Sequence, residues 1–589
     1  MDSTALAHQI DLLERADLLR RAQGQAELEY LFKHALLQES VYDTLLRNDR
    51  RRLHRLVAET LERELSPHEE RVPLLAMHWD KAGVPARAFD YYLRAGKNAA
   101  RVYANAVALM AYDRAFQLAG EFELSPEQAQ TLYSSRGRVL ELQGEYDAAL
   151  ANYQQQEAWA MEHGNLDVEL DALIRRTTLF TTSTKLLNFE KGVQLSQGAL
   201  KRARAAGNRA AEAKILWNLS NAHFFAEQNA EAIRYGEASV AIARELNLRE
   251  QLAFTLNDIA RPYIMAGRHA EAFAAMAEAE ALWRELNNLP MLADNLIGIG
   301  MSSVFAGDYQ SAREQVYEGL RISREIGNIW GESYAHETLG FMYALSGEFE
   351  RALENLLTAL ALGEEANYLD AQYTGAVVGA MLYQMLGVPE KAKSLLARSL
   401  ARPNVAAGWL IIPNAMLAVL QADTGDLEGA QVSLERAESG YEGDTGFWGL
   451  ILHLARIRVV LAQAHPDAAL IEARTAVEQL VSNGLHPFRA LFLYQEALAL
   501  EQLGKLDEAI QSAEAARREL EDTASHTWLW EIFALLARLY AMRGDVVRAQ
   551  ATRQAALVQV QFLADHAPPE FRDSFLNRPE VRALLQNSR

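Results

Sequence analysis

Gly267-Arg-His-Ala-Glu-Ala272, Gly307-Asp-Tyr-Gln-Ser-Ala312 and Gly347-Glu-Phe-Glu-Arg-Ala352 are copies of one short pattern that recurs at a constant spacing. Each copy has a glycine, then in most copies an acidic or aromatic residue, and an alanine five positions after the glycine. Self-similarity at a fixed period of this size is typical of repeat arrays. Further good copies begin at Gly144, Gly387, Gly425, Gly504 and Gly544, and weaker ones centre on Gly83, Leu187, Glu227 and Ala464.

The residue types explain the pattern as a helical hairpin. Glycine adopts the left-handed conformation that ends a first helix, and a small alanine lets a second helix pack closely against it. Another small residue recurs seven positions before the turn, as at Gly300 and Gly340. One hairpin cannot bury its apolar stripe alone, whereas stacked hairpins can.

The pattern resembles the tetratricopeptide repeat, in a long variant whose extra residues we expect to lengthen the second helix. We therefore predict an all-α fold: a tetratricopeptide-like, right-handed superhelical solenoid of about twelve helical hairpins with a period of about 40 residues, preceded by a small winged-helix-like segment. The predicted parts are a winged-helix-like or linker segment (1–70), atypical helical repeats (71–120), the repeat array (121–560) and a C-terminal helical cap or tail (561–589).

Length and composition agree with an array. The chain has 589 residues, more than a single core of about 250 to 300 residues accommodates. It contains no cysteine, which excludes disulfides and thiolate metal sites. Its formal charge of -20 opposes broad nucleic-acid binding, and no long uncharged apolar run or signal sequence is present. We expect a cytoplasmic protein without a membrane or nucleic-acid partner.

The segment before the repeats resembles a known family. Glu27-Leu-Glu-Tyr-Leu-Phe32 predicts a short strand between two helical stretches, as in a wing. Phe32-Lys-His-Ala-Leu-Leu-Gln-Glu-Ser-Val-Tyr42, Leu75-Ala-Met-His-Trp79 and the tail from Ser574 to Leu585 resemble the C-terminal region of bacterial multidomain signalling ATPases, the predicted ATPases associated with adenylate or guanylate cyclases. This resemblance implies a tetratricopeptide sensor that follows a nucleotide-switch ATPase.

The same resemblance implies a role for His34, because related ATPases place a winged-helix histidine against the nucleotide phosphates. The chain itself has no Gly-x-x-x-x-Gly-Lys-Ser/Thr phosphate loop; Ala95-Gly-Lys-Asn98 lacks its upstream glycine and its hydroxyl residue. His34 would therefore contact a nucleotide phosphate only in trans. The alternative is that His34 caps or packs a helix start.

We find no pattern for catalysis or metal binding. The sequence lacks a His-Glu-x-x-His motif and a Gly-x-Ser-x-Gly elbow. His78, His223 and His336 occupy repeat positions, and we interpret them as packing residues. The prediction is a protein that is not an enzyme and uses no cofactor and no metal.

The inner, concave face is where we expect a ligand. In the resembled fold this face is built by first-helix positions 13, 10, 6 and 3 residues before each turn. An aromatic floor with interleaved asparagine and arginine suits a peptide groove, although some of these residues could instead pack between neighbouring helices. The predicted groove residues are Lys214, Trp217, Asn221, Phe224, Phe254, Asn257, Arg261, Met301, Tyr334, Glu337 and Phe341, and the same offsets also give Ile264, Asp294, Ile297 and Val304.

The prediction for function is a non-catalytic scaffold or sensor of a bacterial signal-transduction system that binds a protein or peptide in this groove. A nucleotide-switch ATPase or cyclase is a possible second partner. The alternative is a regulatory C-terminal fragment of a larger ATPase, nucleotide cyclase or ATPase-type transcriptional regulator whose catalytic domains lie upstream.

Overall fold

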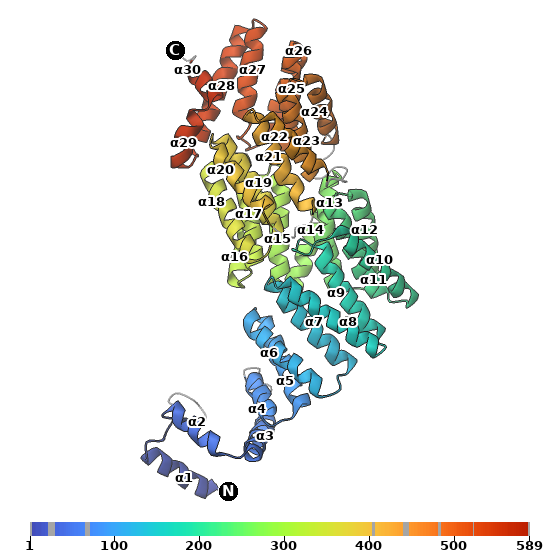
Figure 1. Cartoon of the computed structure of the whole chain (residues 1–589), viewed down its shortest axis with the longest axis vertical. Helices are drawn as coiled ribbons and strands as arrows, with labels where there is room; N and C mark the ends of the chain where they lie inside the picture. The colour runs from blue at the N-terminus through green and yellow to red at the C-terminus, as the bar shows by residue number, and fades with distance from the viewer. Residues whose placement is uncertain are drawn as a thin grey trace. The chain divides into compact units, whose positions relative to one another are not determined.

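The computed structural model describes residues 3–21, 30–64, 71–402, 407–439, 447–480, 485–521 and 523–586, and most of them are helical (Figure 1). They form two compact units, Met1–Val139 and Leu140–Arg589. Within the described ranges, no helix combines the length and hydropathy needed to cross a lipid bilayer. The predicted all-α repeat array is confirmed, while the four predicted domain boundaries remain predictions.

The first unit begins with a helix and a small hairpin of strands. Strand β1 (Leu19–Arg21) pairs antiparallel with β2 (Tyr30–Phe32). The second half of the predicted strand at 27–32 is therefore a strand, and residues 27–29 lie outside the described residues. The helices of this unit are α1 (Ser3–Arg15), α2 (Ala35–Thr44), α3 (Arg47–Glu64), α4 (Val72–Lys81), α5 (Pro85–Arg101), α6 (Asn105–Leu118) and the 3-10 turn η2 (Ala119–Glu121), and α7 (Pro126–Leu142) crosses the boundary between the units.

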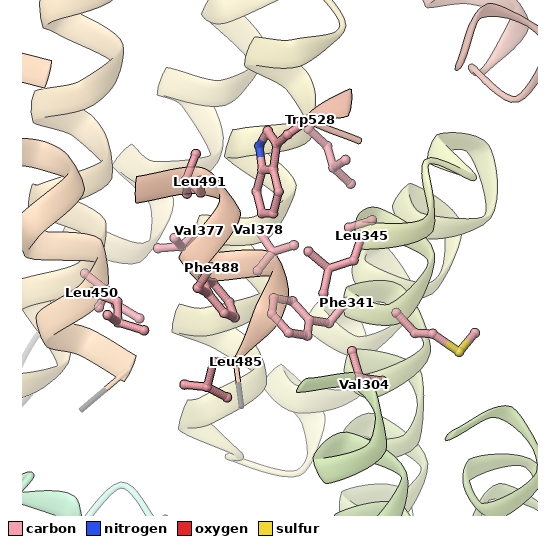
Figure 2. Close-up of a cluster of buried hydrophobic side chains, with 14 of the residues drawn as sticks. Val304, Phe341, Leu345, Val377, Val378, Leu450, Leu485, Phe488, Leu491 and Trp528 are labelled. Atoms are coloured by element: carbon pink, nitrogen blue, oxygen red, sulfur yellow. The ribbon is translucent and has the colours of Figure 1, made fainter. Parts of the chain in front are cut away.

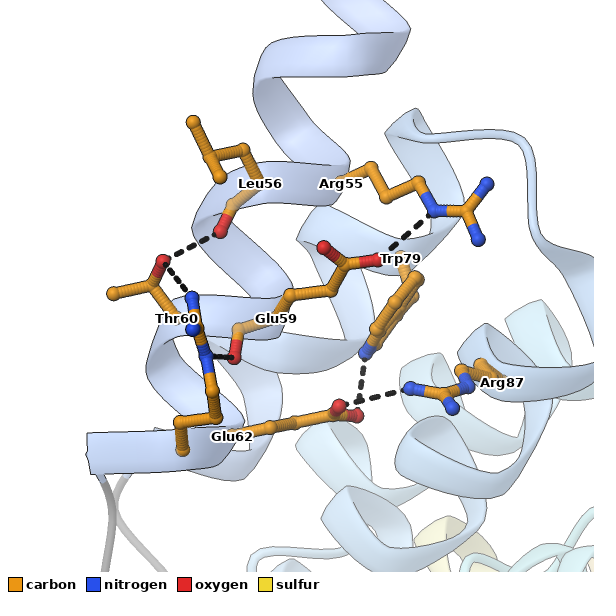
Figure 3. Close-up of polar contacts among 8 residues, drawn as sticks. Arg55, Leu56, Glu59, Thr60, Glu62, Trp79 and Arg87 are labelled. Atoms are coloured by element: carbon orange, nitrogen blue, oxygen red, sulfur yellow. Dashed lines mark hydrogen bonds and ion pairs between the residues drawn. The ribbon is translucent and has the colours of Figure 1, made fainter. Parts of the chain in front are cut away.

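Glu62 joins three helices of this unit (Figure 3). Its carboxylate accepts hydrogen bonds from Trp79 Nε1 at 2.9 Å and from the Arg87 guanidinium at 2.8 Å. It accepts a third from the Tyr91 hydroxyl at 2.9 Å. Trp79 is fully buried. Trp79, one of the residues that carry the family resemblance, thus has a structural role that its burial and this bond explain.

The second unit is the repeat array. Between Arg209 and Met385 every helix has 17 or 18 residues. Its helices are α8 (Tyr146–Glu162), α9 (Leu166–Thr181), α10 (Phe189–Ala205), α11 (Arg209–Phe225), α12 (Asn229–Glu245), α13 (Arg249–Met265), α14 (His269–Leu286), α15 (Leu289–Phe305), α16 (Tyr309–Glu325), α17 (Ile329–Ser346), α18 (Phe349–Glu365), α19 (Leu369–Met385), α20 (Pro389–Leu400), η3 (Ala407–Leu410), α21 (Ile411–Asp423), α22 (Leu427–Glu438), α23 (Phe447–Ala462), α24 (Pro466–Leu480), α25 (His486–Gln502), α26 (Leu506–Glu521), α27 (Leu529–Met542), α28 (Val546–Asp565), α29 (Pro569–Leu576) and α30 (Pro579–Gln586).

The extra residues of the long period are not confined to the second helix, because both helices of these hairpins have nearly the same length. A second series of turns, in addition to the predicted ones, divides the repeat in this way. Residues with positive φ stand at Gly207, Asn247, Asn287, Gly327 and Asn367, midway between the predicted turns at Glu227, Gly267, Gly307, Gly347 and Gly387, which have positive φ as well. The two series share one period, so each repeat consists of two halves of equal length.

The small residues inside the first helices mark close helix approaches, as predicted. A Cβ atom at Gly300 would lie 2.3 Å from Val316 Cγ2, and one at Gly340 would lie 2.6 Å from Leu356 Cγ. Both neighbours belong to the second helix of the same hairpin. Any larger side chain would separate the two helices.

The array also contacts itself over long sequence distances, which a nearest-neighbour repeat does not require. The turn at Gly144 accepts a hydrogen bond from Asn367 Nδ2 at 3.3 Å, and the carbonyl of Met385 accepts one from Arg578 at 3.0 Å. Thr527 donates to the carbonyl of Ala344. These partners are 183 to 223 residues apart, so repeats that are distant in the sequence touch, and the red C-terminal helices lie beside the yellow helices α18 and α20 (Figure 1).

One of these long-range contacts fills the inner side of the array. Phe488, near the start of α25, stacks on Phe341 of α17 with ring centroids 6.2 Å apart, and its ring lies 6.1 Å from that of Phe305 (Figure 2). Phe488 is 5 % exposed. A C-terminal hairpin thus closes part of the surface that the sequence predicts to be an open groove.

Candidate functional site

The inner face of the second unit holds a cavity of about 200 Å³. This volume corresponds to about seven water molecules at liquid density. First helices supply most of its lining: α11, α13, α15, α17 and α19 each contribute residues, most of them spaced three or four positions apart. On α17, for example, Trp330, Tyr334, Glu337 and Phe341 form one stripe, because such spacings place side chains on one face of a helix.

A network of hydrogen bonds fixes the orientation of polar side chains on the side of the cavity formed by α13 and α15. The Asn257 amide nitrogen donates to Asp294 Oδ2 at 2.9 Å and to Asp258 Oδ1 at 3.1 Å. Two carboxylates thus determine the orientation of this amide, and its oxygen accepts from Asn295 Nδ2 at 2.8 Å. The Asn295 orientation follows in turn, and its own carbonyl oxygen is left as an acceptor.

Asp258 pairs with the arginine of the site. Arg261, one turn along α13, places its guanidinium 3.3 Å from Asp258 Oδ1 and 5.8 Å from the centre of the Phe224 ring. Trp217 Nε1 and Asn221 Nδ2 donate to the other Asp258 oxygen at 2.8 and 2.9 Å. Burial disfavours the Arg261 charge, but Asp258 and its neighbours hold the Arg261 pKa above its ordinary value.

Besides Glu227, three carboxylic acids line the cavity in a poorly solvated setting. Burial raises the pKa of Asp294 to about 6, against the opposing effect of Arg261. Burial and, second, the neighbouring charge of Asp370 hold the pKa of Glu337 well above its ordinary value. Burial also raises the pKa of Asp370, although a hydrogen bond from Thr374 at 2.9 Å opposes that rise. The free protein therefore holds these negative charges at a cost in free energy.

Aromatic rings stand beside these acids. The ring of Trp330 lies 4.7 Å from that of Tyr368 and 5.6 Å from that of Tyr334, and the two tyrosine rings are 6.2 Å apart. Burial, together with the charges of Asp294, Glu337 and Asp370, raises the pKa of Tyr334 in spite of the nearby Arg261. The pKa of Tyr334 thus depends on charged groups of three other helices, α13, α15 and α19.

The structure brings most of the predicted groove residues together. Seven of the eleven line the cavity: Phe224, Asn257, Arg261, Met301, Tyr334, Glu337 and Phe341. Ile264 and Asp294, which the same offsets give, line it as well. Four do not: Trp217 and Asn221 hold Asp258, Phe254 packs between Trp217 and Trp283, and Lys214 lies elsewhere on α11. Ile297 and Val304 are buried in the core. Whether the seven bind a ligand remains a prediction.

Four further residues of the lining are not among the predicted groove residues: Asn295, Trp330, Tyr368 and Asp370. A signal for Tyr368 exists, because the equivalent positions one and two repeats earlier are Asn328 and Asn288, whose side chains cap their helices. Tyr368 begins α19 without such a side-chain bond and is 2 % exposed. Replacement of a capping asparagine by a large aromatic residue indicates that the side chain is used for something other than the cap.

The histidines occupy structural positions. His34 is exposed at the first position before α2 and makes no side-chain capping bond, so its predicted contact with a nucleotide phosphate in trans remains a prediction. His78 faces His54 at 2.8 Å, His223 bonds to Gln228, and His336 bonds to Asn355. Over the described parts of the chain, no group of three or more His, Asp or Glu side chains has a metal-binding arrangement.

Comparisons with known proteins give limited similarity. No protein-family model matches the chain. An uncharacterized protein of Rhizobium meliloti (strain 1021) is 30% identical over 124 residues, which are 21% of this chain and 12% of that protein. Among solved structures, a Rap protein complexed with competence and sporulation factor has a TM-score of 0.45 at 14% identity, over 67% of this chain and 98% of that one. A human IFIT1 dimer with m7Gppp-AAAA has a TM-score of 0.37 at 16% identity, over 63% and 80%.

Proposed function

We propose that the second unit is a binding module that takes a peptide, or an extended segment of a protein, into the cavity on its inner face. The observation that carries the proposal is the cavity itself, which combines apolar walls with a few oriented polar groups from five neighbouring first helices. Such a lining is typical of ligand sites, in which apolar contacts provide affinity and polar groups provide orientation.

The repeat architecture supports a role in sensing. Each lining first helix belongs to a different hairpin, so a ligand that touches α13, α15, α17 and α19 links four repeats at once. Because each repeat packs mainly on its neighbours, the ligand would change the equilibrium between relative repeat orientations. A bacterial signal-transduction scaffold that reports ligand occupancy through its curvature is the form of this function that we favour.

Gly298 offers a clean test. It lines the cavity on α15, and a Cβ atom there would meet only the Tyr334 hydroxyl, at 3.9 Å. A leucine at this position would fill the cavity without a backbone clash, whereas an alanine would leave most of it open. The probe is a pool of N-acetylated, C-amidated dodecapeptides of mixed sequence, equilibrated with the protein, with retained peptides identified by mass spectrometry.

We expect wild type and Gly298→Ala to retain the same subset of peptides and Gly298→Leu to lose it, while all three give the same circular dichroism. Equal retention by Gly298→Leu would contradict the cavity as the binding site. Retention of no peptide by the wild type would contradict the proposed function.

Our second proposal is that the chain is related to an ATPase or cyclase. Its N-terminal elements follow the order helix α1, strand hairpin β1–β2 and helix α2, which suits a winged-helix-like segment. In this version the module is a regulatory fragment of a larger ATPase, nucleotide cyclase or transcriptional regulator. Sequencing the genomic DNA before the Met1 codon tests it. An in-frame phosphate-loop motif would support the proposal, and a stop codon without one would contradict it.

A further inference from the structure

The charges that line the cavity do not balance. The lining holds four carboxylic acids: Glu227, Asp294 and Glu337, which are buried, and Asp370, which is partly buried. Arg261 is the one cation among the lining residues that the structure describes. Arg261 is already paired with Asp258, a further carboxylate just outside the lining. The acids of the cavity therefore outnumber the cations that the described lining supplies.

Two of the most deeply buried acceptor atoms in the lining have no hydrogen-bond partner among the described residues. They are Oε2 of Glu337, a residue only 3 % exposed whose carboxyl group also interacts with Tyr368, and Oδ1 of Asn295, a residue only 1 % exposed. The hydrogen bonds of Asn257 fix the Asn295 amide, so an amide flip would not remove this acceptor. Buried acceptors without donors are costly, and both of these require a group that donates hydrogen bonds.

The aromatic residues point to the same chemistry. Trp330, Tyr334 and Tyr368 stand beside Glu337 and Asp370 in the lining. The face of an aromatic ring carries partial negative charge and attracts ammonium and guanidinium groups. Excess acids, acceptors without donors and aromatic faces all favour a cation with N–H donors.

We propose that the cavity binds the cationic end of a lysine or arginine side chain of a peptide, with Glu337 and Asp370 as its carboxylate partners and Asn295 as an additional acceptor. This inference rests on the proposed function and specifies its ligand. The cavity of about 200 Å³ has room for an alkylammonium or guanidinium group together with part of its aliphatic stem. Phe341 and Met301 are apolar residues of the lining against which this stem can pack.

The raised pKa values of the acids agree with this assignment and predict a second measurable effect, the release of protons on binding. A bound cation stabilises the ionised forms of Asp294, Glu337 and Asp370, whose pKa values burial raises in the free protein. Binding must then release protons, and affinity must rise as the pH increases from about 5 to 8. A neutral ligand at the same site would release none.

The test uses four pools of N-acetylated, C-amidated dodecapeptides that contain otherwise uncharged residues. One central position is fixed as lysine, arginine, norleucine or citrulline. Spermidine and agmatine serve as free cations. The proteins are wild type, Glu337→Gln, Asp370→Asn and the control Glu325→Gln, which removes one negative charge from an exposed position on α16. Titration calorimetry in two buffers of different ionisation enthalpy gives the affinity and the number of protons released.

We expect the lysine and arginine pools to bind wild type and Glu325→Gln about 10- to 100-fold more tightly than their neutral counterparts, the range for a buried charge-assisted hydrogen bond. Glu337→Gln and Asp370→Asn should each remove about 10-fold or more of this difference, with unchanged circular dichroism. Proton release should accompany binding to wild type and decrease in Glu337→Gln.

Other outcomes would overturn the inference in distinguishable ways. Equally tight binding of lysine and norleucine pools, lost in Gly298→Leu, would refute the cation and retain the peptide function. If spermidine or agmatine binds more tightly than any peptide pool, the ligand would be a free amine rather than a peptide side chain. Displacement of the lysine pool by millimolar Mg²⁺ or Ca²⁺ would favour a metal ion. Binding of no pool would refute the proposed function as well.

Discussion

Asn295 donates a hydrogen bond to the Asn257 carbonyl oxygen across 2.8 Å, and this one contact determines which atom Asn295 presents to the cavity. Asn257 has no freedom to turn, because its amide nitrogen lies between two carboxylates. The lining residues Asn257, Asp294 and Asn295 thus orient one another, and Asp258, just outside the lining, holds Asn257 from behind. A preorganised acceptor reduces the entropy that a ligand must lose on binding.

Replacement of Asn257 by alanine should destabilise the second unit. Asp258, Asp294 and Asn295 would each lose a buried hydrogen bond, which we expect to cost about 1 to 3 kcal/mol of unfolding free energy. Urea denaturation followed by circular dichroism measures the change. The same stability as wild type would mean that the network is not formed. Loss of binding in this variant is therefore weaker evidence for a contact than loss in Gly298→Leu.

Replacement of Asp294 by asparagine should stabilise the free protein, in a pH-dependent way. Its pKa of about 6 in the folded protein lies above the value of about 3.9 of an unfolded chain. The folded state therefore holds the proton more tightly, so ionisation of Asp294 costs stability above about pH 6 and costs none below about pH 4. Arg261 and Asp258 on α13 are its charged neighbours, and Tyr334 faces it from α17.

We expect Asp294→Asn to gain about 1 to 2 kcal/mol at pH 8 and to lose this advantage near pH 4. Urea unfolding at the two pH values measures it. A gain that is the same at both pH values would contradict the raised pKa. If the cation proposal holds, the stabilised variant should also bind the lysine pool less tightly, because its negative charge serves the ligand rather than the fold.

Two glycines on one helix should respond in opposite ways to the same change. Gly298 faces the cavity, where an added methyl group meets nothing closer than 3.9 Å, so Gly298→Ala should gain up to about 1 kcal/mol from helix propensity. Gly300 faces α16, where the methyl group would lie 2.3 Å from Val316, so Gly300→Ala should lose about 1 to 3 kcal/mol. Thermal unfolding compares them directly. Equal shifts would refute the assigned helix faces.

The sequence predicts a close helix approach at Gly300, which belongs to the recurring small positions, and makes no prediction for Gly298. It also predicts the turns at Gly267, Gly307 and Gly347 and nine of the 27 residues that line the cavity, since helical spacing determines which residues share a face. The sequence does not predict the contact of Phe488 with Phe341. That contact depends on the accumulated rotation over several repeats, which no single repeat encodes.

Removal of the Phe488 side chain tests this closure. Phe488→Ala should cost about 3 to 5 kcal/mol because it empties a buried aromatic site between α17 and α25. The matched control is Val547→Ala, at a residue that is 78 % exposed, with an expected change of less than about 0.5 kcal/mol. Urea denaturation measures both. A loss in Phe488→Ala no greater than that of the control would contradict the inward packing of α25.

The location of the ligand is the central claim, and hydrogen–deuterium exchange of the second unit with and without the lysine-fixed dodecapeptide pool tests it most directly. We expect added protection in α13, α15, α17 and α19, which line the cavity, and little change in the outer helices α10, α16 and α20, which contribute no residue to the described lining. This protection should be absent in Gly298→Leu. Protection confined to the outer helices, or retained in Gly298→Leu, would contradict the account.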